Sequence, residues 1–432
     1  MTPPVSMSAG YAMRCLWISR HIPFPSDDGA KVYSANLAQS LAQSGMLVRF
    51  MGIGNADAVP NTAANVEWLP VPGKKRGKMI ASLGAWPIAA AIDATKPYRA
   101  LLEAQLREPW DAVVLDSYAT GWALDRCLAY RNDWHAHQPV LVHVSHNHEE
   151  LLWGVMAREA RGSALKRLAL RRNAIKVGAL ERRIIRSIDL LTTITDEDLQ
   201  SLGAGLGQDR SLALTPGYTG WIASVRHITA ATPRRVIIMG SFQWIVKQEN
   251  LVRFVEIADP IFKEQGIELD IVGDVPPALL AMLKGRCRAT HFHGFVSNAA
   301  LYLSSARLAV VPESIGGGFK LKFLDYIFGR VPVATVSQAT AGLPAELQCA
   351  MLSSDSLSGL VRKIVSHIDR IDDLNRLQES AFTIGKSEFK WSVRGERFRQ
   401  AIDNVRQTKT GMHAASHLPP PANVQTIDLA VS

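Results

Sequence analysis

The stretch RCLWISRHIPFPSDDGAKVYSANLAQSLAQSGMLVRFMGIG, residues 14–54, reads as a strand, a helix and a second strand. An apolar run begins at Arg14 and stops at two prolines, and a helix-like segment follows SDDG. Gly45 is placed to end that helix, and LVRFMGIG is the second strand. The stretch therefore predicts a β-α-β unit. The apolar stripe of the helix consists of Val32, Ala35, Leu37, Ala38, Leu41 and Ala42.

The alternation of strands and helices continues along the chain. DAVVLDS, PVLVHVSHN and DLLTTIT are strand-like runs in the first half, with helical segments between them. The second half repeats the pattern with RVIIMGSF, IELDIVGD, THFHGFV, ARLAVVPES and VPVATV. Alternation of this kind predicts an α/β fold with parallel, doubly wound sheets.

The pattern breaks between the two halves. In LTPGYTGWIASVRHITAATPRR, residues 214–235, proline, glycine and threonine accumulate without a period. We therefore expect an N-terminal domain over residues 14–214 and a C-terminal domain over 215–390. A helix over 391–408 is expected to pack back on the N-terminal domain. The two ends, residues 1–13 and the proline- and alanine-rich 409–432, are predicted to be flexible and disordered.

The composition is that of a globular chain with anionic partners. Its 432 residues are 47% hydrophobic, enough for two cores, and the net charge of +9 favours a nucleotide, a lipid head group or nucleic acid. The four cysteines form no CxxC pair, which argues against disulfides and structural zinc. No secretory signal is visible at the start, and no apolar run reaches the ~18 residues of a membrane span. We expect a cytoplasmic protein, either soluble or peripheral on the inner face of the cell membrane.

A glycine cluster lies in VVPESIGGGFKLKFLDYIFGRVPV, residues 310–333. Ligands of doubly wound sheets bind at the carboxyl ends of the strands, and here a strand-like run leads into the cluster. Gly316, Gly317 and Gly318 allow backbone amides to approach a phosphate at a helix N-terminus. The alternative interpretation is an ordinary glycine-rich loop, because short glycine motifs occur widely.

Charged side chains follow the glycines at short intervals. Lys320 and Lys322 add two cations for a phosphate, or are solvated in the alternative interpretation. Asp325 lies one or two turns into the helix that follows and is placed to accept hydrogen bonds from hydroxyl groups, such as those of a ribose. The segment thus predicts a nucleotide site.

From Pro312 to Thr335 the pattern PxxxGxGxKxKxxDxxxGxxPVxT resembles the nucleotide-sugar site of group-1 glycosyltransferases, the large retaining, family-4-like group with the GT-B fold. Three other stretches resemble family segments in the same order: PFPSDDGAKVYSANLAQSLAQSGMLVRFM, SHNHEELLW, and IIMGSFQW followed by LDIVGD and HFHGFV. The match covers about residues 14–391. It implies two Rossmann-like, doubly wound parallel-sheet domains that face each other across a cleft.

The resemblance implies where the donor binds. Many relatives contact it with two glutamates separated by seven residues; the second aligns with Asp325, on the ribose, and the first falls on Gly317. This GxGxKxK variant is implied to hold the diphosphate through backbone amides and lysines, and it weakens any assignment of a carboxylate to the transferred sugar. Ser241 and Lys247, after the first strand of the second domain, are further implied donor contacts. Lys247 as a surface lysine is the alternative.

The loop after the first strand is implied to line the same cleft. Gly29 lets this loop approach the donor phosphates or the acceptor closely, and it is one of the implied catalytic positions. Asp27 and Asp28 line the cleft by resemblance, and Asp28 is a second implied catalytic position. Either aspartate capping the following helix is the alternative interpretation.

Three histidines in HVSHNHEE raise the question of a metal site. In an extended strand His143 points to the face opposite the later histidines, and the family offers a metal-free explanation, so we expect no metal. His146 is the implied active-site histidine, with Asn147 and Glu149 fixing its loop. A hydrogen-bonded structural histidine is the alternative.

Two basic segments bear on the acceptor. REARGSALKRLALRRNAIKVGALERRIIR, from Arg158 to Arg186, has ten lysines or arginines and two glutamates, interleaved with apolar residues at helical spacing. It suits either an anionic membrane surface or a solvated helix face. PGKKRGKMIASLGAWPIAAAI, residues 72–92, adds a basic loop and a short apolar stretch. No aromatic-basic motif for nucleic acid accompanies them, so we expect no nucleic-acid partner.

The sequence therefore predicts a glycosyltransferase that moves a hexose from a nucleotide-diphosphate sugar to a glycan or lipid-linked acceptor in exopolysaccharide, capsule or lipopolysaccharide synthesis. No cofactor is expected, and by resemblance the enzyme is retaining and metal-independent. Two alternatives stay open: a nucleotide-sugar epimerase of the same fold, and a non-catalytic nucleotide-sugar-binding partner of a biosynthetic complex.

Overall fold

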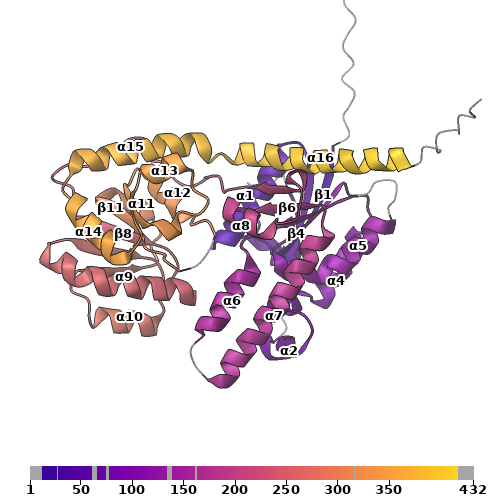
Figure 1. Ribbon diagram of the computed structural model, residues 1–432, viewed down its shortest axis with the longest axis horizontal. Coiled ribbons are helices and arrows are strands. Elements are labelled where there is room, and N and C mark those ends of the chain that lie inside the picture. The colour runs from indigo at the N-terminus through magenta and orange to yellow at the C-terminus, as the bar shows by residue number, and fades with distance from the viewer. Residues whose placement is uncertain are drawn as a thin grey trace, which may run out of the picture.

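The computed structural model describes residues 12–26, 28–60, 66–73, 77–133, 139–160, 163–315 and 318–416. Two sheets, each flanked by helices, lie side by side along the long axis of the molecule (Figure 1). The first has seven strands in the order β3-β2-β1-β4-β5-β6-β7, and the second has six in the order β10-β9-β8-β11-β12-β13. All pairs of these strands are parallel, which confirms the two doubly wound α/β domains.

The first domain contains the strands β1 (Arg14–His21), β2 (Leu47–Ile53), β3 (Val66–Val71), β4 (Ala112–Asp116), β5 (Val140–Val144), β6 (Leu190–Thr193) and β7 (Ser211–Ala213). Its helices are α1 (Gly29–Gln43), α2 (Lys78–Leu83), α3 (Ile88–Asp93), α4 (Lys96–Gln105), α5 (Leu124–Asp133), α6 (Glu149–Glu159), α7 (Ala164–Ser187) and α8 (Asp196–Leu202). Helices α6 and α7 form a hairpin that projects from the domain (Figure 1).

The second domain contains the strands β8 (Arg235–Met239), β9 (Glu268–Val272), β10 (Thr290–Gly294), β11 (Leu308–Val311), β12 (Val333–Val336) and β13 (Leu352–Ser354). Its helices are α9 (Ile245–Glu264), α10 (Pro277–Lys284), α11 (Ala299–Ser305), α12 (Lys322–Phe328), α13 (Ala345–Cys349), α14 (Leu357–His367) and α15 (Ile371–Glu388). The last helix, α16 (Trp391–Ser416), leaves this domain and runs along the first (Figure 1).

The predicted β-α-β unit is present as β1, α1 and β2. Asp28 caps α1, because its side chain accepts a hydrogen bond from the Lys31 amide at 2.9 Å. Gly45 follows the helix with a φ of +100°, a conformation that glycine adopts without steric cost. Short or atypical strands escaped prediction: β3 carries Pro70 at the edge of its sheet, and β7 and β13 have three residues each.

Helix α16 joins the second domain to the first. Phe398 and Ile402 are buried in the core beneath α1, and the Lys409 ammonium lies 2.9 Å from the Asp189 carboxylate. The helix extends to Ser416, beyond the predicted end at residue 408. Among the described helices, none is both long and apolar enough to cross a membrane.

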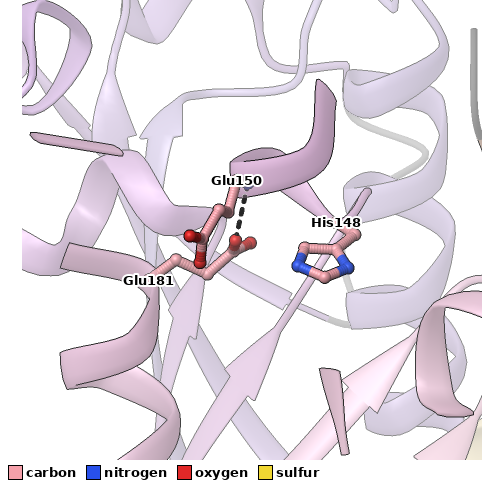
Figure 2. A group of neighbouring side chains, drawn as sticks. All are labelled: His148, Glu150 and Glu181. Carbon is pink, nitrogen blue, oxygen red and sulfur yellow. Dashed lines mark hydrogen bonds between the residues drawn. The ribbon is translucent and has the colours of Figure 1, made fainter. Parts of the chain in front are cut away.

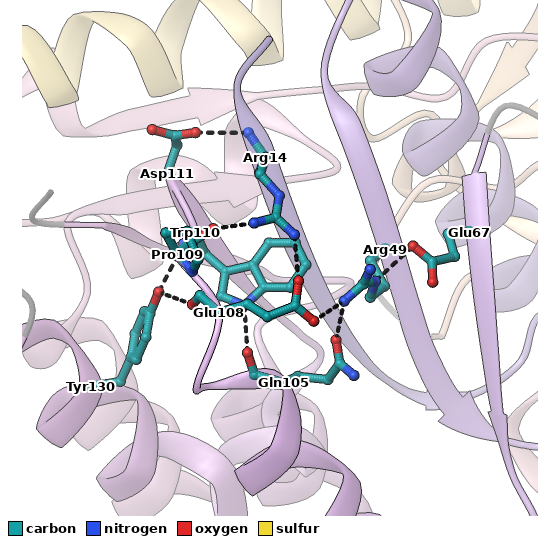
Figure 3. Close-up of polar contacts among 9 residues, drawn as sticks. All are labelled: Arg14, Arg49, Glu67, Gln105, Glu108, Pro109, Trp110, Asp111 and Tyr130. Atoms are coloured by element: carbon teal, nitrogen blue, oxygen red, sulfur yellow. Dashed lines mark hydrogen bonds and ion pairs between the residues drawn. The ribbon is translucent and has the colours of Figure 1, made fainter. Parts of the chain in front are cut away.

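The amino ends of the strands in the first sheet are tied together by charges (Figure 3). The Glu108 carboxylate accepts hydrogen bonds at 2.5 Å from Arg14 at the start of β1 and from Arg49 on β2. Both guanidinium groups also stack over the Trp110 ring, and the Asp111 carboxylate accepts the Arg14 amide at 2.8 Å. These contacts hold the amino ends of the strands together. Ligands of doubly wound sheets bind at the opposite, carboxyl edge.

Candidate active site

The carboxyl edges of the two domains touch through loops. Gly318, in the loop after β11, has a φ of +74°, and a β-carbon built there would lie 2.6 Å from the Asn147 Oδ1 in the loop after β5. A β-carbon on Gly29, at the start of α1, would lie 3.2 Å from the Leu321 Cδ1. The two glycines therefore allow an approach between domains that a larger residue would obstruct.

His146 lies beside Asp116, the last residue of β4. The His146 Nε2 is 2.6 Å from the Asp116 Oδ1, and the Trp17 Nε1 donates to the other carboxylate oxygen at 3.0 Å. The Tyr33 ring packs edge-on against the imidazole, with centroids 5.5 Å apart. Sequence reasoning did not single out Asp116. Its signal was its position, since Asp116 is the penultimate residue of DAVVLDS and lies at the carboxyl end of a central strand.

Burial and the ion pair act in opposite directions on these two groups. Burial disfavours the charged imidazole, but the Asp116 carboxylate outweighs it and raises the pKa of His146 above 6.5. Burial also disfavours the Asp116 carboxylate, and the attraction to His146 nevertheless lowers the pKa of Asp116 below 3.8. The pair therefore favours an imidazolium beside a carboxylate at the carboxyl edge of the first sheet.

The three histidines of this segment have separate surroundings. His143, on β5, is buried and its Nδ1 is 2.9 Å from the Leu115 carbonyl oxygen. His148 lies 2.8 Å from the Ser201 hydroxyl through its Nδ1. Their different partners separate them from His146, and the three rings do not converge.

His148, Glu150 and Glu181 nonetheless lie together, with ligand atoms within 4.8 Å of one another (Figure 2). Glu181, on α7, accepts the backbone amides of Glu149 at 3.0 Å and Glu150 at 2.7 Å. Glu150 pairs with Arg182. Both carboxylates thus have structural partners, and the buried Glu181 caps the start of α6.

Asn147 and Glu149 belong to the same turn. The Asn147 amide donates to the Glu149 Oε1 at 3.3 Å, and α6 begins at Glu149. Burial raises the pKa of Glu149, and the hydrogen bond from Asn147 opposes that rise. These contacts hold the loop that carries His146.

Across the cleft, lysines gather around one acid. The Lys322 ammonium is 2.5 Å from the Glu313 Oε1, and both side chains are nearly buried. Burial lowers the pKa of Lys320 to about 8, and the nearby Lys322 and Lys247 charges add to the effect while Glu313 opposes it. Burial and Lys322 likewise lower the pKa of Lys247, against the attraction of Glu313 and Asp28. Three cations thus lie near one another at this edge, a grouping that suits an anion, and Glu313, Asp28 and Asp198 are the acids that act on them.

Glu313 is the acid that sequence reasoning missed. It lies two residues after β11, at the carboxyl edge of the second sheet. Its Oε2 is buried and has no hydrogen-bond partner among the described residues. The sequence ES before the glycines was its only signal, and the family pattern drew attention instead to Gly317.

Two domains of known type cover most of the chain. Residues 28–216 match the glycosyl transferase 4-like domain, and residues 233–369 match the domain of glycosyl transferases group 1. The chain is a GT-B glycosyltransferase. No curated protein matches it.

Solved structures share the fold of this glycosyltransferase at low sequence identity. Sucrose-phosphate synthase from Thermosynechococcus elongatus is 15% identical, with a TM-score of 0.61 over 93% of this chain and 100% of that one. WaaG, a glycosyltransferase involved in lipopolysaccharide biosynthesis, is 17% identical, with a TM-score of 0.60 over 90% and 99%. Anabaena HepE, solved in complex with UDP-glucose, is 13% identical, with a TM-score of 0.57 over 92% and 100%.

Two further predicted donor residues of the glycosyltransferase, Asp325 and Ser241, follow strands at the same edge. Asp325, on α12, accepts a hydrogen bond from the Tyr218 hydroxyl at 3.2 Å, and burial raises the pKa of Asp325 to about 6. Ser241 is exposed in the loop after β8. Gly316, Gly317 and Asp27 lie outside the described residues.

Proposed function

We propose that this glycosyltransferase transfers a hexose from a nucleotide-diphosphate sugar, with the diphosphate bound by Lys247, Lys320 and Lys322. The observation that carries the proposal is that Lys247 and Lys320 lie close enough to the Lys322–Glu313 ion pair for their charges to act on one another, opposite the His146 loop. Asp325 is assigned to the ribose hydroxyls, and the Ser241 loop and the glycine amides to the phosphates. Anabaena HepE, solved with UDP-glucose, supports a donor of this class.

The chemistry follows from where charge develops. As the bond to the sugar breaks, negative charge grows on the departing diphosphate, and cations already in place stabilise it without reorganising solvent. Lys320, with a pKa of about 8, is mostly protonated at neutral pH, so it contributes charge. We propose that these side chains act without an obligatory metal.

His146 and its partner are assigned to the opposite side of the sugar. The pair with Asp116 fixes the orientation of the ring and favours its charged form, in which the remaining N–H group donates a hydrogen bond toward the cleft. Asp28 and Gly29 lie at the same end of α1, where a donor or acceptor would pass. Retention at the anomeric carbon is proposed as the usual outcome of the family.

Glu313 gives a structural explanation for the missing acid at position 317. We assign it to holding Lys322 in place and to accepting a hydrogen bond from the donor sugar through its second oxygen. A carboxylate four residues earlier in the loop would then do part of the work of the family's first glutamate.

The acceptor is proposed to be a glycan or lipid-linked sugar in exopolysaccharide, capsule or lipopolysaccharide synthesis, at the inner face of the cell membrane. WaaG, which acts in lipopolysaccharide biosynthesis, has the same fold, and the exposed cations of α7 suit an anionic surface.

The experiment incubates the purified protein with a panel of nucleotide sugars, with and without a bacterial lipid extract. Donor-dependent transfer into the extract supports the proposal. Isomerisation of the sugar without any acceptor would instead identify an epimerase, and donor binding with neither reaction would identify a non-catalytic partner.

A further inference from the structure

A large apolar cavity opens beside the His146 loop. It has a volume of about 890 Å³, within the ~300–1,000 Å³ of pockets that bury small ligands. Asn147 and His148 line one end of it, and Ile315 lines it from the loop that carries the donor lysines. The apolar wall is formed by Leu152, Val155 and Met156 of α6, Leu170 of α7, and Ile245 and Val246 of α9. The cavity is therefore built by both domains and joins the catalytic cleft.

The outer side of the cavity meets an unusual helix end. Residues 163–169, the start of α7, are all exposed, so this end of the helix is largely open to solvent. Leu165 and Leu168 are 77% and 64% exposed, although each carries a large apolar side chain. We call this segment, residues 163–169, the hairpin tip.

Cations accompany these apolar residues. Arg167, Arg171 and Arg172 are exposed, and no ion pair joins them to the described residues. No acidic residue occurs between Ser163 and Lys176. Exposed leucines among unpaired cations match the boundary of an anionic bilayer, where the chains bury apolar groups and the head groups neutralise positive charge.

Resting on the function proposed above, we propose that the cavity binds the hydrocarbon chain of a membrane-anchored acceptor, which leaves the bilayer at the hairpin tip. Leu170 lines the cavity and follows the tip directly, so Leu168 of the tip lies within one helical turn of the cavity wall. The far end, at Asn147, would then place the acceptor's sugar beside His146. The acceptor's substrate class is an amphiphile with a long apolar chain.

Acidic side chains restrict where the acceptor's anionic linker can lie. Glu159, Asp198 and Glu249 also line the cavity, and Arg253 there is paired with Glu249 at 3.0 Å. Lys166 lines the cavity as well, so the rim holds three acids and two cations and offers a phosphate no net attraction, whereas the hydrocarbon chain is unaffected by it. The linker is therefore expected at the catalytic end, near Lys320, whose charge partners include Asp198.

The test measures binding of dodecyl phosphate, kept below its micellar concentration, by titration calorimetry, with butyl phosphate as the short-chain control. We expect dodecyl phosphate to bind at least tenfold more tightly than butyl phosphate, with the negative heat-capacity change of apolar burial. Val155→Trp and Val246→Trp fill the cavity from opposite domains and are expected to weaken dodecyl phosphate binding at least tenfold. Leu168→Asn, at the hairpin tip, is the matched control and should leave it unchanged.

Binding of UDP, ADP and GDP, measured on the same preparations, verifies folding and separates the two proposals. Equal dodecyl phosphate affinity in the filled variants, or an equal loss in Leu168→Asn, would overturn the cavity assignment. If no nucleoside diphosphate binds the wild-type protein, the donor proposal fails while the chain-length result still decides the cavity.

A second measurement does not depend on the variants. Dodecyl phosphate carrying a diazirine near the chain end is photo-crosslinked to the wild-type protein and the labelled peptides are mapped. Labels in α6 and α9 are expected, and labels confined to other surfaces contradict the proposal.

Discussion

The two edges of the first sheet use charge in opposite ways. At the amino edge, Glu108 bridges Arg14 and Arg49, each at 2.5 Å, so cations and acid are matched and partly exposed (Figure 3). At the carboxyl edge, the Asp116–His146 pair is buried and both pKa values are displaced from their usual range. The exposed ion pairs of the amino edge join strands and each contributes little to stability. The buried pair of the carboxyl edge has displaced pKa values, which are typical of functional sites.

The second domain extends the contrast. Three lysines lie near one another at its carboxyl edge, and one buried oxygen of Glu313 has no partner among the described residues. Unmatched buried charge destabilises a protein unless a ligand completes it. The difference supports our proposal that the amino edge serves folding and the carboxyl edges serve binding.

The largest effect is expected at the lysines. Lys322→Met should lower the rate of sugar transfer about 10²–10³-fold, the usual cost of removing one group that stabilises developing charge. Steady-state transfer rates measure it, and Lys284→Met, an exposed lysine at the end of α10, is the control with an unchanged rate.

The same substitution separates binding from stability. It leaves Glu313 buried without its cation, so the thermal midpoint should also fall. The double variant Glu313→Gln/Lys322→Met should recover stability but not transfer. Recovery of both would remove Lys322 from the proposed role.

Asp116→Asn should have the next largest effect. Losing a hydrogen bond between charged groups, worth ~1.5–3 kcal/mol, predicts roughly tenfold or more slower transfer. The pKa of His146, which Asp116 raises, should fall because burial is then opposed only by the Glu149 and Asp28 charges. NMR titration of the imidazole measures this pKa. A value that does not move would contradict the pairing.

The His146 pair also predicts a pH dependence of stability. A raised folded-state pKa means that the pair's contribution is fully present below pH 6.5 and is lost as pH rises through the folded-state pKa. Denaturant unfolding across this range should show that loss in the wild-type protein. The loss should be absent in Asp116→Asn.

Glu313→Gln tests the shared acid. In the wild-type protein, affinity for a nucleoside diphosphate should decline as pH rises through about 8, because Lys320 loses its proton. Without the Glu313 carboxylate the pKa of Lys320 falls further, so the decline should move to lower pH. Calorimetric titration of UDP at several pH values gives the midpoint, and Glu313→Asp should restore it in part.

Gly318→Ala tests the contact between the domains. Both Gly318 and Gly45 have positive φ values, +74° and +100°, but only at Gly318 would a β-carbon meet the opposing domain. Each alanine variant should lose about 1 kcal/mol of unfolding free energy. Only Gly318→Ala should also slow transfer, and equal transfer rates in the two variants would contradict a role for that contact.

The smallest effect is expected at the amino edge. Glu108→Gln should cost about 0.2–1 kcal/mol of unfolding free energy, as for exposed ion pairs, with transfer unchanged. Denaturant unfolding and the transfer assay measure the two quantities. Slower transfer in this variant would erase the distinction between the edges.

The sequence predicted the fold well because long apolar strands and helical stripes are local signals. The β-α-β unit at residues 14–54 appears as β1, α1 and β2, whereas β3, with its proline, and the three-residue β7 have no such signal. Motif position placed Lys320, Lys322, Asp325 and His146 at the facing edges.

Contacts between residues that are distant in the sequence could not be predicted from it. Asp116 and His146 are 30 residues apart, and they meet because their strands, β4 and β5, are neighbours in the sheet. Nothing in the sequence around Glu313 distinguishes it from other acids. The structure shows that it is paired with Lys322 and that its second oxygen is buried. Such pairs follow from packing, which residue letters alone do not encode.

The most direct test of the central claim is the thermal midpoint of the purified wild-type protein with UDP, ADP and GDP, compared with Lys322→Met. A ligand that binds only the folded state must raise the midpoint, so one nucleoside diphosphate should stabilise the wild-type protein and stabilise the variant far less. No stabilisation of the wild-type protein by any of the three, well above usual affinities, would contradict a diphosphate site at this edge.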